Sequence, residues 1–247
     1  NPNMPAFFLY YQEGELLGLL TVYADDHDVE VAILVAPDYR RKGIARSLFD
    51  KFQKETAPYP IRSVTFQTER VFLDRHPDLA SHWGVVEDEE TETWLGRDKT
   101  PYALDSRSDV KVLLAEPSYL DEIAQLHHQA FSDPEETLDV SRRYITEALK
   151  DSDGLLYILL KEAQVIGVCT VDLSGNNNYL YGLAVAEAYR GQCYGSYLAK
   201  SVVNQLIAQN DKSFQIAVED SNVGAKRLYE KIGFVKQTQV VYLKQKG

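Results

Sequence analysis

The sequence predicts an α/β fold of the mixed (α+β) kind, present twice in one chain. The first observation is that strand-like and helix-like segments alternate over the C-terminal half. The second is an internal repeat: Gly18 corresponds to Gly167 and Arg40 to Arg190. Leu79-x-x-x-x-Gly84 likewise corresponds to Leu228-x-x-x-x-Gly233. Corresponding residues lie 149 (167 − 18) or 150 (190 − 40) positions apart. Because this spacing is far too long for the repeats of a solenoid, we expect two domains of one fold.

The C-terminal copy shows its elements most clearly. Strand formers, helical spacing of apolar residues and turn residues such as Ser174–Asn178 define them. We also expect Asp133-Pro134 to open the second helix, as an N-cap followed by a first-turn proline. In order, the expected elements are strand Val110–Ala115, helices Pro117–Phe131 and Asp133–Lys150, strands Leu155–Lys161, Val165–Leu173 and Tyr179–Val185, helix Gly195–Asn210, strand Phe214–Val218, helix Asn222–Ile232 and strand Thr238–Leu243.

The N-terminal copy begins abruptly. Ala6 corresponds to Leu155, so this copy lacks a first strand and two helices. Either the chain has been trimmed or its first domain is incomplete by nature. The polar, turn-rich stretch Gly96–Asp109 is the expected boundary, which gives domains of residues 1–104 and 105–247.

Composition narrows the class of protein. The 247 residues carry a net charge of −11, which argues against general nucleic-acid binding and would suit a cationic partner. No apolar run approaches the ~20 residues that span a membrane. With only Cys169 and Cys193 there is no disulfide framework, so we expect a cytoplasmic protein. The adjacent His127 and His128 would point apart on a helix, and no metal site is expected.

The two basic turns are candidate phosphate sites. Each lies between a strand and a helix, where free backbone N–H groups and the helix dipole attract an anion. The second reads Arg190-x-x-Cys193-x-Gly195 and the first Arg40-x-x-Gly43-x-Ala45. Neither fits the nucleotide P-loop or the dinucleotide fingerprint.

With its flanking strand and helix, this pattern resembles the acetyl-CoA loop of the GNAT superfamily of N-acetyltransferases. Asn222-x-x-Ala225-x-x-Leu228-Tyr229-Glu230-Lys231-x-Gly233-Phe234 is similar to the fourth-helix motif of that family. The resemblance covers nearly all of Val110–Gly247 and, more weakly, Ala6–Leu95. It implies two GNAT-like domains, each a twisted mixed sheet flanked by helices. One departure is Cys193 at a position where the family usually has glycine.

The resemblance implies that acetyl-CoA is the co-substrate. The loop would hold the pyrophosphate and the strand edge the pantetheine arm, at Leu183, Ala184, Val185, Arg190, Gly191, Gln192, Cys193, Tyr194, Gly195, Ser196, Asn222 and Ala225. In the first copy the corresponding candidates are Val35, Arg40, Arg41, Lys42, Gly43, Ile44 and Ala45. A redox role for Cys193 and a simple N-cap role for Asn222 are alternatives.

Transfer of the acetyl group to an amine needs an acid for the departing thiolate and a base for the amine. The resemblance assigns the acid to Tyr229, and the alternative is that Tyr229 only packs on the sheet. Glu219 is the candidate base, with Asp220 and Tyr181 as alternatives.

The first copy has a complete basic loop, but Tyr229, Asn222 and Ala225 correspond there to Ala80, Leu73 and His76. Pro77 interrupts the helix of that copy. We therefore expect a first domain that can bind coenzyme A without this catalytic apparatus, although Glu30 leaves another mechanism open.

The sequence thus predicts an acetyl-CoA-dependent N-acetyltransferase whose acceptor is an amine-bearing small molecule or peptide, without nucleic acid or membrane as partner. The alternative is a non-catalytic coenzyme A sensor or scaffold.

Overall fold

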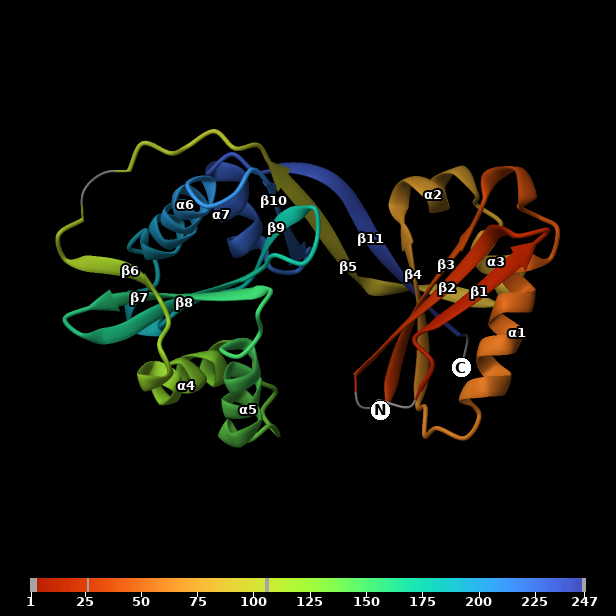
Figure 1. Ribbon diagram of the computed structural model, residues 1–247, viewed down its shortest axis with the longest axis horizontal. Helices are drawn as coiled ribbons and strands as arrows, with labels where there is room; N and C mark the ends of the chain where they lie inside the picture. The colour runs from red at the N-terminus through yellow and green to blue at the C-terminus, as the bar shows by residue number, and fades with distance from the viewer. Residues whose placement is uncertain (1–3, 26, 105–106, 246–247) are drawn as a thin grey trace. The chain divides into compact units, whose positions relative to one another are not determined.

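The computed structural model describes residues 4–25, 27–104 and 107–245 of the protein. Its contacts divide the chain into two compact units. Unit 1 consists of Asn1–Glu92 and Thr238–Gly247, and unit 2 of Thr93–Gln237. Each unit is described by itself below, with the element labels of Figure 1.

Unit 2 is a mixed sheet with helices on both faces. Its strands are hydrogen-bonded in the order β11-β5-β10-β9-β8-β7-β6, and all neighbours from β6 to β9 are antiparallel, whereas β9 and β10 are parallel. The elements that lie wholly in this unit are β6 (Val110–Leu114), η2 (Pro117–Tyr119), α4 (Leu120–Phe131), α5 (Leu138–Ala148), β7 (Gly154–Lys161), β8 (Gln164–Asp172), β9 (Asn177–Val185), η3 (Glu187–Tyr189), α6 (Tyr194–Ile207), β10 (Ser213–Glu219) and α7 (Val223–Lys231).

Two apolar clusters hold these helices to the sheet. The first packs α6 and α7 on one face and includes Leu198, Phe214 and Tyr229. The second packs α4 and α5 on the opposite face, around Ile123 and Ile145. Figure 1 shows the two pairs of helices on opposite sides of the strands. Burial on both faces explains why β7 and β8 are continuous apolar runs rather than alternating ones.

One helix start differs from the expectation. Helix α5 begins at Leu138 with Thr137 at the N-cap position, not at Asp133-Pro134. Instead, the Asp133 carbonyl accepts a 3.0 Å hydrogen bond from the Glu136 N–H. Asp133 therefore starts a tight turn that precedes the helix, because an Asp-Pro pair favours turn initiation as readily as helix entry.

Unit 1 repeats part of this architecture, with strand order β1-β2-β3-β4-β11-β5. Among its described residues, no helix or strand precedes β1, and α1 is the helix that joins the parallel strands β3 and β4. Its elements are β1 (Phe7–Gln12), β2 (Glu15–Asp25), β3 (Asp28–Val35), η1 (Pro37–Tyr39), α1 (Ile44–Thr56), β4 (Ser63–Glu69), α2 (Arg70–Arg75) and α3 (Leu79–Trp83).

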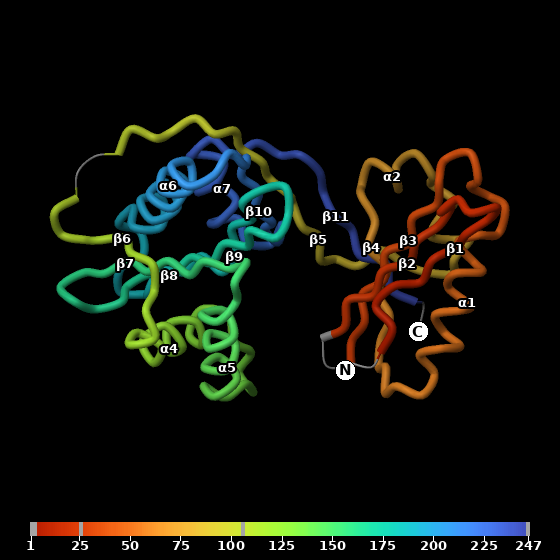
Figure 2. The backbone as a smooth tube through the Cα atoms, viewed as in Figure 1, coloured from red at the N-terminus to blue at the C-terminus, as the bar shows by residue number. Residues whose placement is uncertain are grey.

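The division into units differs from a single boundary after residue 104. β5 (Val85–Arg97) begins in unit 1 and ends in unit 2, whereas β11 (Val235–Gln245) begins in unit 2 and ends in unit 1. The two strands are hydrogen-bonded neighbours, and Figure 2 traces them side by side. In unit 1, β11 pairs antiparallel with β4, so that Val240 faces Glu69. A boundary read from turn residues cannot reveal such an exchange, because strand pairing depends on contacts distant in sequence.

The strand registers explain why the offset between the two copies changes, from 149 residues (167 − 18) at Gly18 and Gly167 to 150 (190 − 40) at Arg40 and Arg190. In unit 1, β2 and β3 pair without interruption, with Thr21 opposite Ala32 and Gly18 opposite Val35. In unit 2, Thr170 faces Tyr181 and Val168 faces Ala184, so β9 has one extra residue opposite Cys169. Gly182, at φ +58°, lies in this β-bulge. The bulge therefore accounts for the single residue by which the loop offset exceeds the strand offset.

Gly182 should be hard to replace. We expect Gly182→Ala to lower the free energy of unfolding by about 1 kcal/mol, because an L-side chain disfavours the left-handed region. Gly175→Ala is the matched control: a Cβ there meets open space and φ is not positive. Urea denaturation of both variants tests this expectation, and an equal effect in the two would contradict it.

Candidate functional site

The loop between β9 and α6 presents a row of free backbone donors. Tyr197 is the first residue of α6 whose N–H bonds back along the chain, to the Cys193 carbonyl at 3.0 Å. Among the described residues, the N–H groups of residues 191–196 have no hydrogen-bond acceptor. Free N–H groups at the start of a helix, together with its dipole, form a site for an anion.

The loop owes its path to two residues in the left-handed region. Gly191 has φ +75° and Cys193, the N-cap residue of α6, has φ +64°. Their counterparts in unit 1, Arg41 and Gly43, have φ +61° and +85°. Cys193 thus adopts the backbone conformation of the glycine at the equivalent position, with its thiol exposed. The change from glycine leaves the fold of the loop intact.

Arg190 fixes the loop to the strand. Its Nε donates to the Val185 carbonyl at 2.9 Å, and Arg40 Nε donates to the Val35 carbonyl at 3.1 Å in unit 1. Each arginine closes the turn and remains exposed. The first contribution of each arginine is therefore to the shape of the loop. Its exposed guanidinium also adds positive charge at the edge of the candidate anion site.

β9 has a free edge just before this loop. Its parallel pairing with β10 runs from Asn177 opposite Ser213 to Leu180 opposite Ile216 and then ends. Beyond it, Ala184 and Val185 pair only on the β8 side. Backbone groups from Tyr181 to Val185 therefore face away from β8 without a strand partner among the described residues. An extended ligand arm can hydrogen-bond to such an edge.

The start of α6, the edge of β9 and α7 meet closely. A Cβ on Gly195 would lie 3.1 Å from Leu228 Cδ1, 3.6 Å from Val185 Cγ2 and 3.8 Å from Leu183 Cδ2. Since 3.1 Å is tighter than ordinary van der Waals contact, glycine permits this approach. The structure thus brings three of the motifs found in the sequence to one place.

Tyr229 lies on α7 with only 6% of its surface exposed. Its ring packs edge-on against Phe234, with centroids 6.1 Å apart. Burial, followed by the influence of Cys169 and Tyr179, raises the pKa of Tyr229 above its ordinary value. The phenol therefore holds its proton throughout the neutral range.

Asn222 caps the same helix: its Oδ1 accepts a 3.0 Å hydrogen bond from the Ala225 N–H. The structure thus supports the N-cap role of Asn222. The cap also engages the N–H of Ala225, the other candidate residue on this helix.

The candidate bases have different surroundings. Glu219, at the end of β10, is exposed and accepts one long hydrogen bond of 3.4 Å from Ser221 Oγ. Asp220 is committed to an ion pair with Lys226 Nζ at 2.6 Å and accepts a hydrogen bond from Thr93 Oγ1. Burial raises the pKa of Tyr181, so this phenol is also protonated at neutral pH. Of the three, Glu219 keeps a carboxylate available.

Arg107 supports the loop from outside the sequence motifs. It donates to the Gln192 carbonyl at 3.3 Å and lies 4.2 Å over the Tyr194 ring. The Tyr194 hydroxyl in turn donates to Asp109 at 2.9 Å, and Lys161 pairs with the same carboxylate at 3.0 Å. These bonds, Lys161 first, lower the pKa of Asp109 to about 2. No sequence pattern marks this network, because its members come from separate elements.

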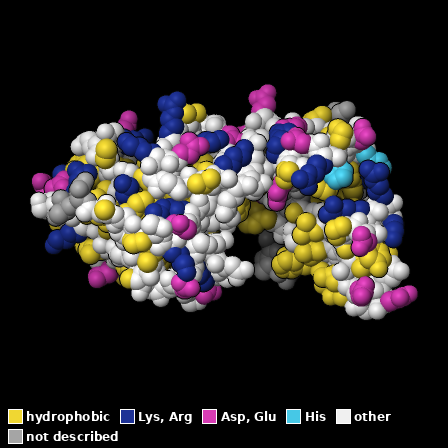
Figure 3. Space-filling view, turned by 90° about the horizontal axis from the view of Figure 1, so that it is seen from above, with side chains coloured by type: hydrophobic (Ala, Val, Ile, Leu, Met, Phe, Trp, Pro, Cys, Tyr) yellow, Lys and Arg dark blue, Asp and Glu magenta, His cyan; other side chains and the backbone are white. Residues whose placement is uncertain are grey.

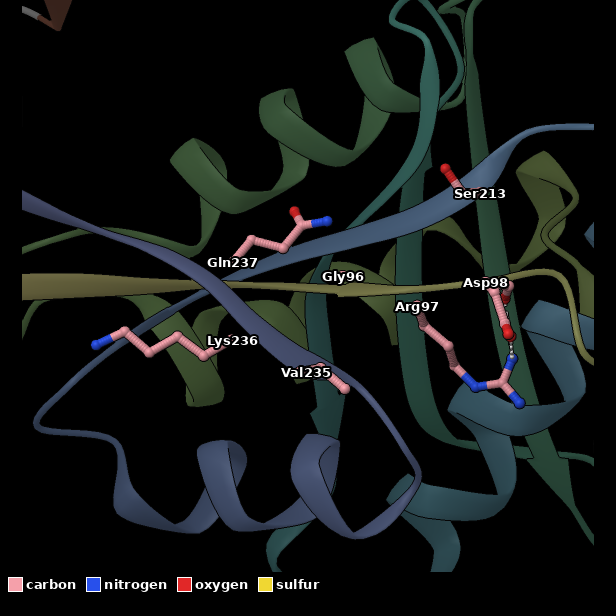
Figure 4. Close-up of a pocket in the computed structure, with 7 residues that line it drawn as sticks. All are labelled: Gly96, Arg97, Asp98, Ser213, Val235, Lys236 and Gln237. Atoms are coloured by element: carbon pink, nitrogen blue, oxygen red, sulfur yellow. Dashed lines mark hydrogen bonds and ion pairs between the residues drawn. The ribbon is translucent and has the colours of Figure 1, made fainter. Parts of the chain in front are cut away.

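Two further depressions lie in unit 2, each of about 300 Å³. One is lined by residues of β5, β10 and β11 with their flanks, and none of them is a candidate site residue. Figure 4 shows Arg97 directed toward Asp98 there, and the Gln237 amide beside Gly96. The other depression lies between α5 and β9.

Unit 1 contains the basic loop, but two short helices stand at the position that corresponds to α7 of unit 2. α2 ends at Arg75 and α3 begins at Leu79, on either side of Pro77, as the helix-breaking proline predicts. Ala80 in α3 provides no phenol. The Glu30 carboxylate accepts a hydrogen bond from the Gln67 amide.

Within the described ranges, no three His, Cys, Asp or Glu side chains gather as a metal site requires. No helix formed by those residues is long and apolar enough to cross a bilayer. Figure 3 shows acidic and basic side chains interspersed on one face of the described residues.

Residues 120–234 match the acetyltransferase (GNAT) family, and residues 4–76 match an acetyltransferase (GNAT) domain. The chain belongs to the GNAT acetyltransferase family. It is a tandem member, and the two matches fall on the two repeats described above.

Individual relatives of this GNAT protein are distant. It is 25% identical over 235 residues to the mycothiol acetyltransferase of Clavibacter sepedonicus, covering 90% of this chain and 74% of that protein. It is 29% identical over 89 residues to the [ribosomal protein bS18]-alanine N-acetyltransferase of Haemophilus ducreyi, covering 35% of this chain and 61% of that protein. A tandem GNAT protein from the clavulanic acid biosynthesis pathway has the same fold, with a TM-score of 0.73 at 16% identity over 98% of this chain and 85% of that one.

The cap of α7 provides a direct test of the local structure. We expect Asn222→Ala to lower the free energy of unfolding by about 1 kcal/mol, because the Ala225 N–H loses its acceptor. Asn222→Asp keeps an acceptor oxygen and should cost much less. Thermal and urea unfolding of both variants measure this difference; equal losses would show that the cap is not the source.

Proposed function

We propose that this GNAT protein transfers an acetyl group from acetyl-CoA to a primary amine, and that unit 2 catalyses the transfer. The observation that carries this proposal is that the free-donor loop and the free edge of β9 meet α7 at Leu228, the residue that precedes Tyr229. Unit 1 has such a loop and such an edge and lacks this tyrosine. The cytoplasm is the compartment that the two free cysteines favour.

Coenzyme A fits the groups that the structure offers. The unbonded N–H groups of residues 191–196 suit the pyrophosphate, with Arg190 at the rim. The edge from Leu183 to Val185 suits the amides of the pantetheine arm, since each amide can exchange hydrogen bonds with an unpaired strand. Ala225 and Asn222 line the nearby start of α7.

The proposed reaction is direct attack. The neutral amine nitrogen forms a bond to the thioester carbonyl carbon, and the carbon–sulfur bond breaks. The proton lost by the amine goes to Glu219, directly or through water. Tyr229 donates its phenolic proton to the departing sulfur and regains one from solvent. Glu219 is proposed as the base because Asp220 is held by Lys226 and Tyr181 is protonated.

The relatives widen rather than narrow the choice of acceptor. One is named for mycothiol and the other for an alanine of ribosomal protein bS18. An amine-bearing small molecule or a peptide amine is therefore the proposed acceptor class. The alternative is a coenzyme A sensor or scaffold, which the degenerate helix of unit 1 would suit.

Tyr229→Phe tests the acid. The variant keeps the buried ring, so we expect a normal circular dichroism spectrum, an unchanged KM for acetyl-CoA and a kcat lower by on the order of 100-fold. Because the pKa of Tyr229 is raised, wild-type kcat should show no loss from deprotonation of this group up to pH 10. Thiol release over a panel of amines measures these values. Full activity in the variant would remove Tyr229 from the mechanism, and tight binding without turnover of any amine would favour the sensor.

The loop in unit 1 should bind a second coenzyme A. Isothermal titration of the full chain with coenzyme A should give two equivalents, and Gly43→Val should reduce this number to one by forcing a side chain into a left-handed position of the loop. Gly84→Val changes another left-handed glycine, outside the loop, and should keep both. A single equivalent in the unchanged protein would contradict binding in unit 1.

A further inference from the structure

A pocket of about 300 Å³ lies between α5 and β9. It is lined by Tyr144, Glu147 and Ala148 of α5, by Asp151 just after that helix and by Tyr181 of β9. We call it the α5–β9 pocket. The α5 residues of this pocket are not part of the candidate coenzyme A site. All the residues that line the pocket belong to unit 2.

The α5–β9 pocket adjoins the proposed reaction centre. Tyr181 immediately precedes Gly182 in the bulge, and Leu183 begins the proposed pantetheine edge. Since a strand rises about 3.3 Å per residue, the pocket wall lies about 7 Å along β9 from that edge. A molecule anchored in the pocket could thus reach the thioester with a chain of a few bonds.

Two phenol rings form the aromatic part of the α5–β9 pocket. Tyr144 and Tyr181 both line it. Tyr181 also stacks on Tyr179 with centroids 5.8 Å apart, and Tyr179 stacks on Trp94 at 5.6 Å. These stacks hold the Tyr181 ring in place. Fixed aromatic faces attract an alkylammonium group by cation–π interaction.

The carboxylates of the α5–β9 pocket lack cationic partners. Among the described residues, no Lys or Arg forms an ion pair with Glu147 or Asp151, whereas Asp109, Asp220 and Asp88 are all paired. Asp151 accepts one hydrogen bond, from the Asp153 N–H at 3.0 Å. Burial, then Tyr144 and the carboxylate of Asp172, raise the pKa of Tyr181, which agrees with a negative local potential. A cationic ligand would therefore meet carboxylates that no basic side chain of the described residues occupies.

We propose that the α5–β9 pocket binds a second cationic group of the acceptor, so that the preferred substrate is a diamine or polyamine rather than a simple monoamine. One amine stays protonated, held against the two phenol rings and beside the carboxylates of Glu147 and Asp151. The other, several bonds away, reaches the thioester as the neutral nucleophile. This inference rests on the proposed function of the same site.

The test compares hexylamine with 1,6-diaminohexane, which differ only by the second amine. With the full chain and acetyl-CoA, we expect kcat/KM for the diamine to exceed that for hexylamine by about tenfold, the combined effect of a cation–π contact and ion pairs with the exposed carboxylates. The double variant Glu147→Gln, Asp151→Asn should remove this preference. The Asn side chain keeps the oxygen that accepts from Asp153, so the turn is preserved.

Asp139→Asn is the matched control. Asp139 is an exposed carboxylate in the first turn of α5, outside the pocket, and its loss changes charge on the same helix. This variant should keep the diamine preference. Equal kcat/KM for the two amines in the unchanged protein, or equal effects of Asp139→Asn and the double variant, would overturn the proposal.

Direct binding separates this inference from the proposed function. If neither amine is acetylated, the proposed transfer to simple amines fails, and calorimetry with 1,6-diaminohexane still tests the pocket. Binding that is weakened about tenfold by the double variant and not by Asp139→Asn would support the α5–β9 pocket. Absence of binding, or binding that is insensitive to the double variant, would contradict it.

Discussion

The separation of two parallel strands is the constraint on which the rest of the site depends. β9 and β10 pair as far as Leu180 and Ile216, and β3 and β4 pair as far as Val31 and Phe66. Beyond these points one edge of β9 or β3 is left without a strand partner. The following loop then turns into a helix whose first N–H groups are also free. Both features leave backbone polar groups unsatisfied, and a ligand rich in amides and phosphates would supply their partners.

The parallel strands separate in both units, so their separation does not depend on the bulge, which β9 has and β3 lacks. The bulge at Gly182 adds a residue to β9 exactly where the edge begins to be free. It also leaves Tyr181 in the α5–β9 pocket while Leu183 approaches Gly195. A one-residue insertion thus changes what each side chain beyond it contacts, as expected when a bulge re-aims a strand.

Interactions from distant segments complete unit 2. Arg107 and Asp109 precede β6, yet they hold the loop through the Gln192 carbonyl and the Tyr194 hydroxyl. Lys226 forms an ion pair with Asp220. Among the described residues, no Lys or Arg pairs with Glu219, which directly precedes Asp220 in the sequence. Such distinctions govern which groups remain free for chemistry. They arise from pairings between elements, and a scan for motifs treats both carboxylates alike.

The sequence by itself determined the mixed α/β class, the repeat, the order of the elements in unit 2 and the family, because periodicity, turn residues and loop spacing are local properties of the chain. It also marked Pro77 as the break between α2 and α3. Only the tertiary structure decided that β5 and β11 are each divided between the units, that Asp133 starts a turn and that Asn222 caps α7. Only it decided which acidic side chains are paired. The divided strands and most of the acidic pairings depend on contacts between residues far apart in the chain, which local pattern does not encode. The turn at Asp133 and the cap by Asn222 join residues three apart, and there the local pattern suits more than one conformation or role.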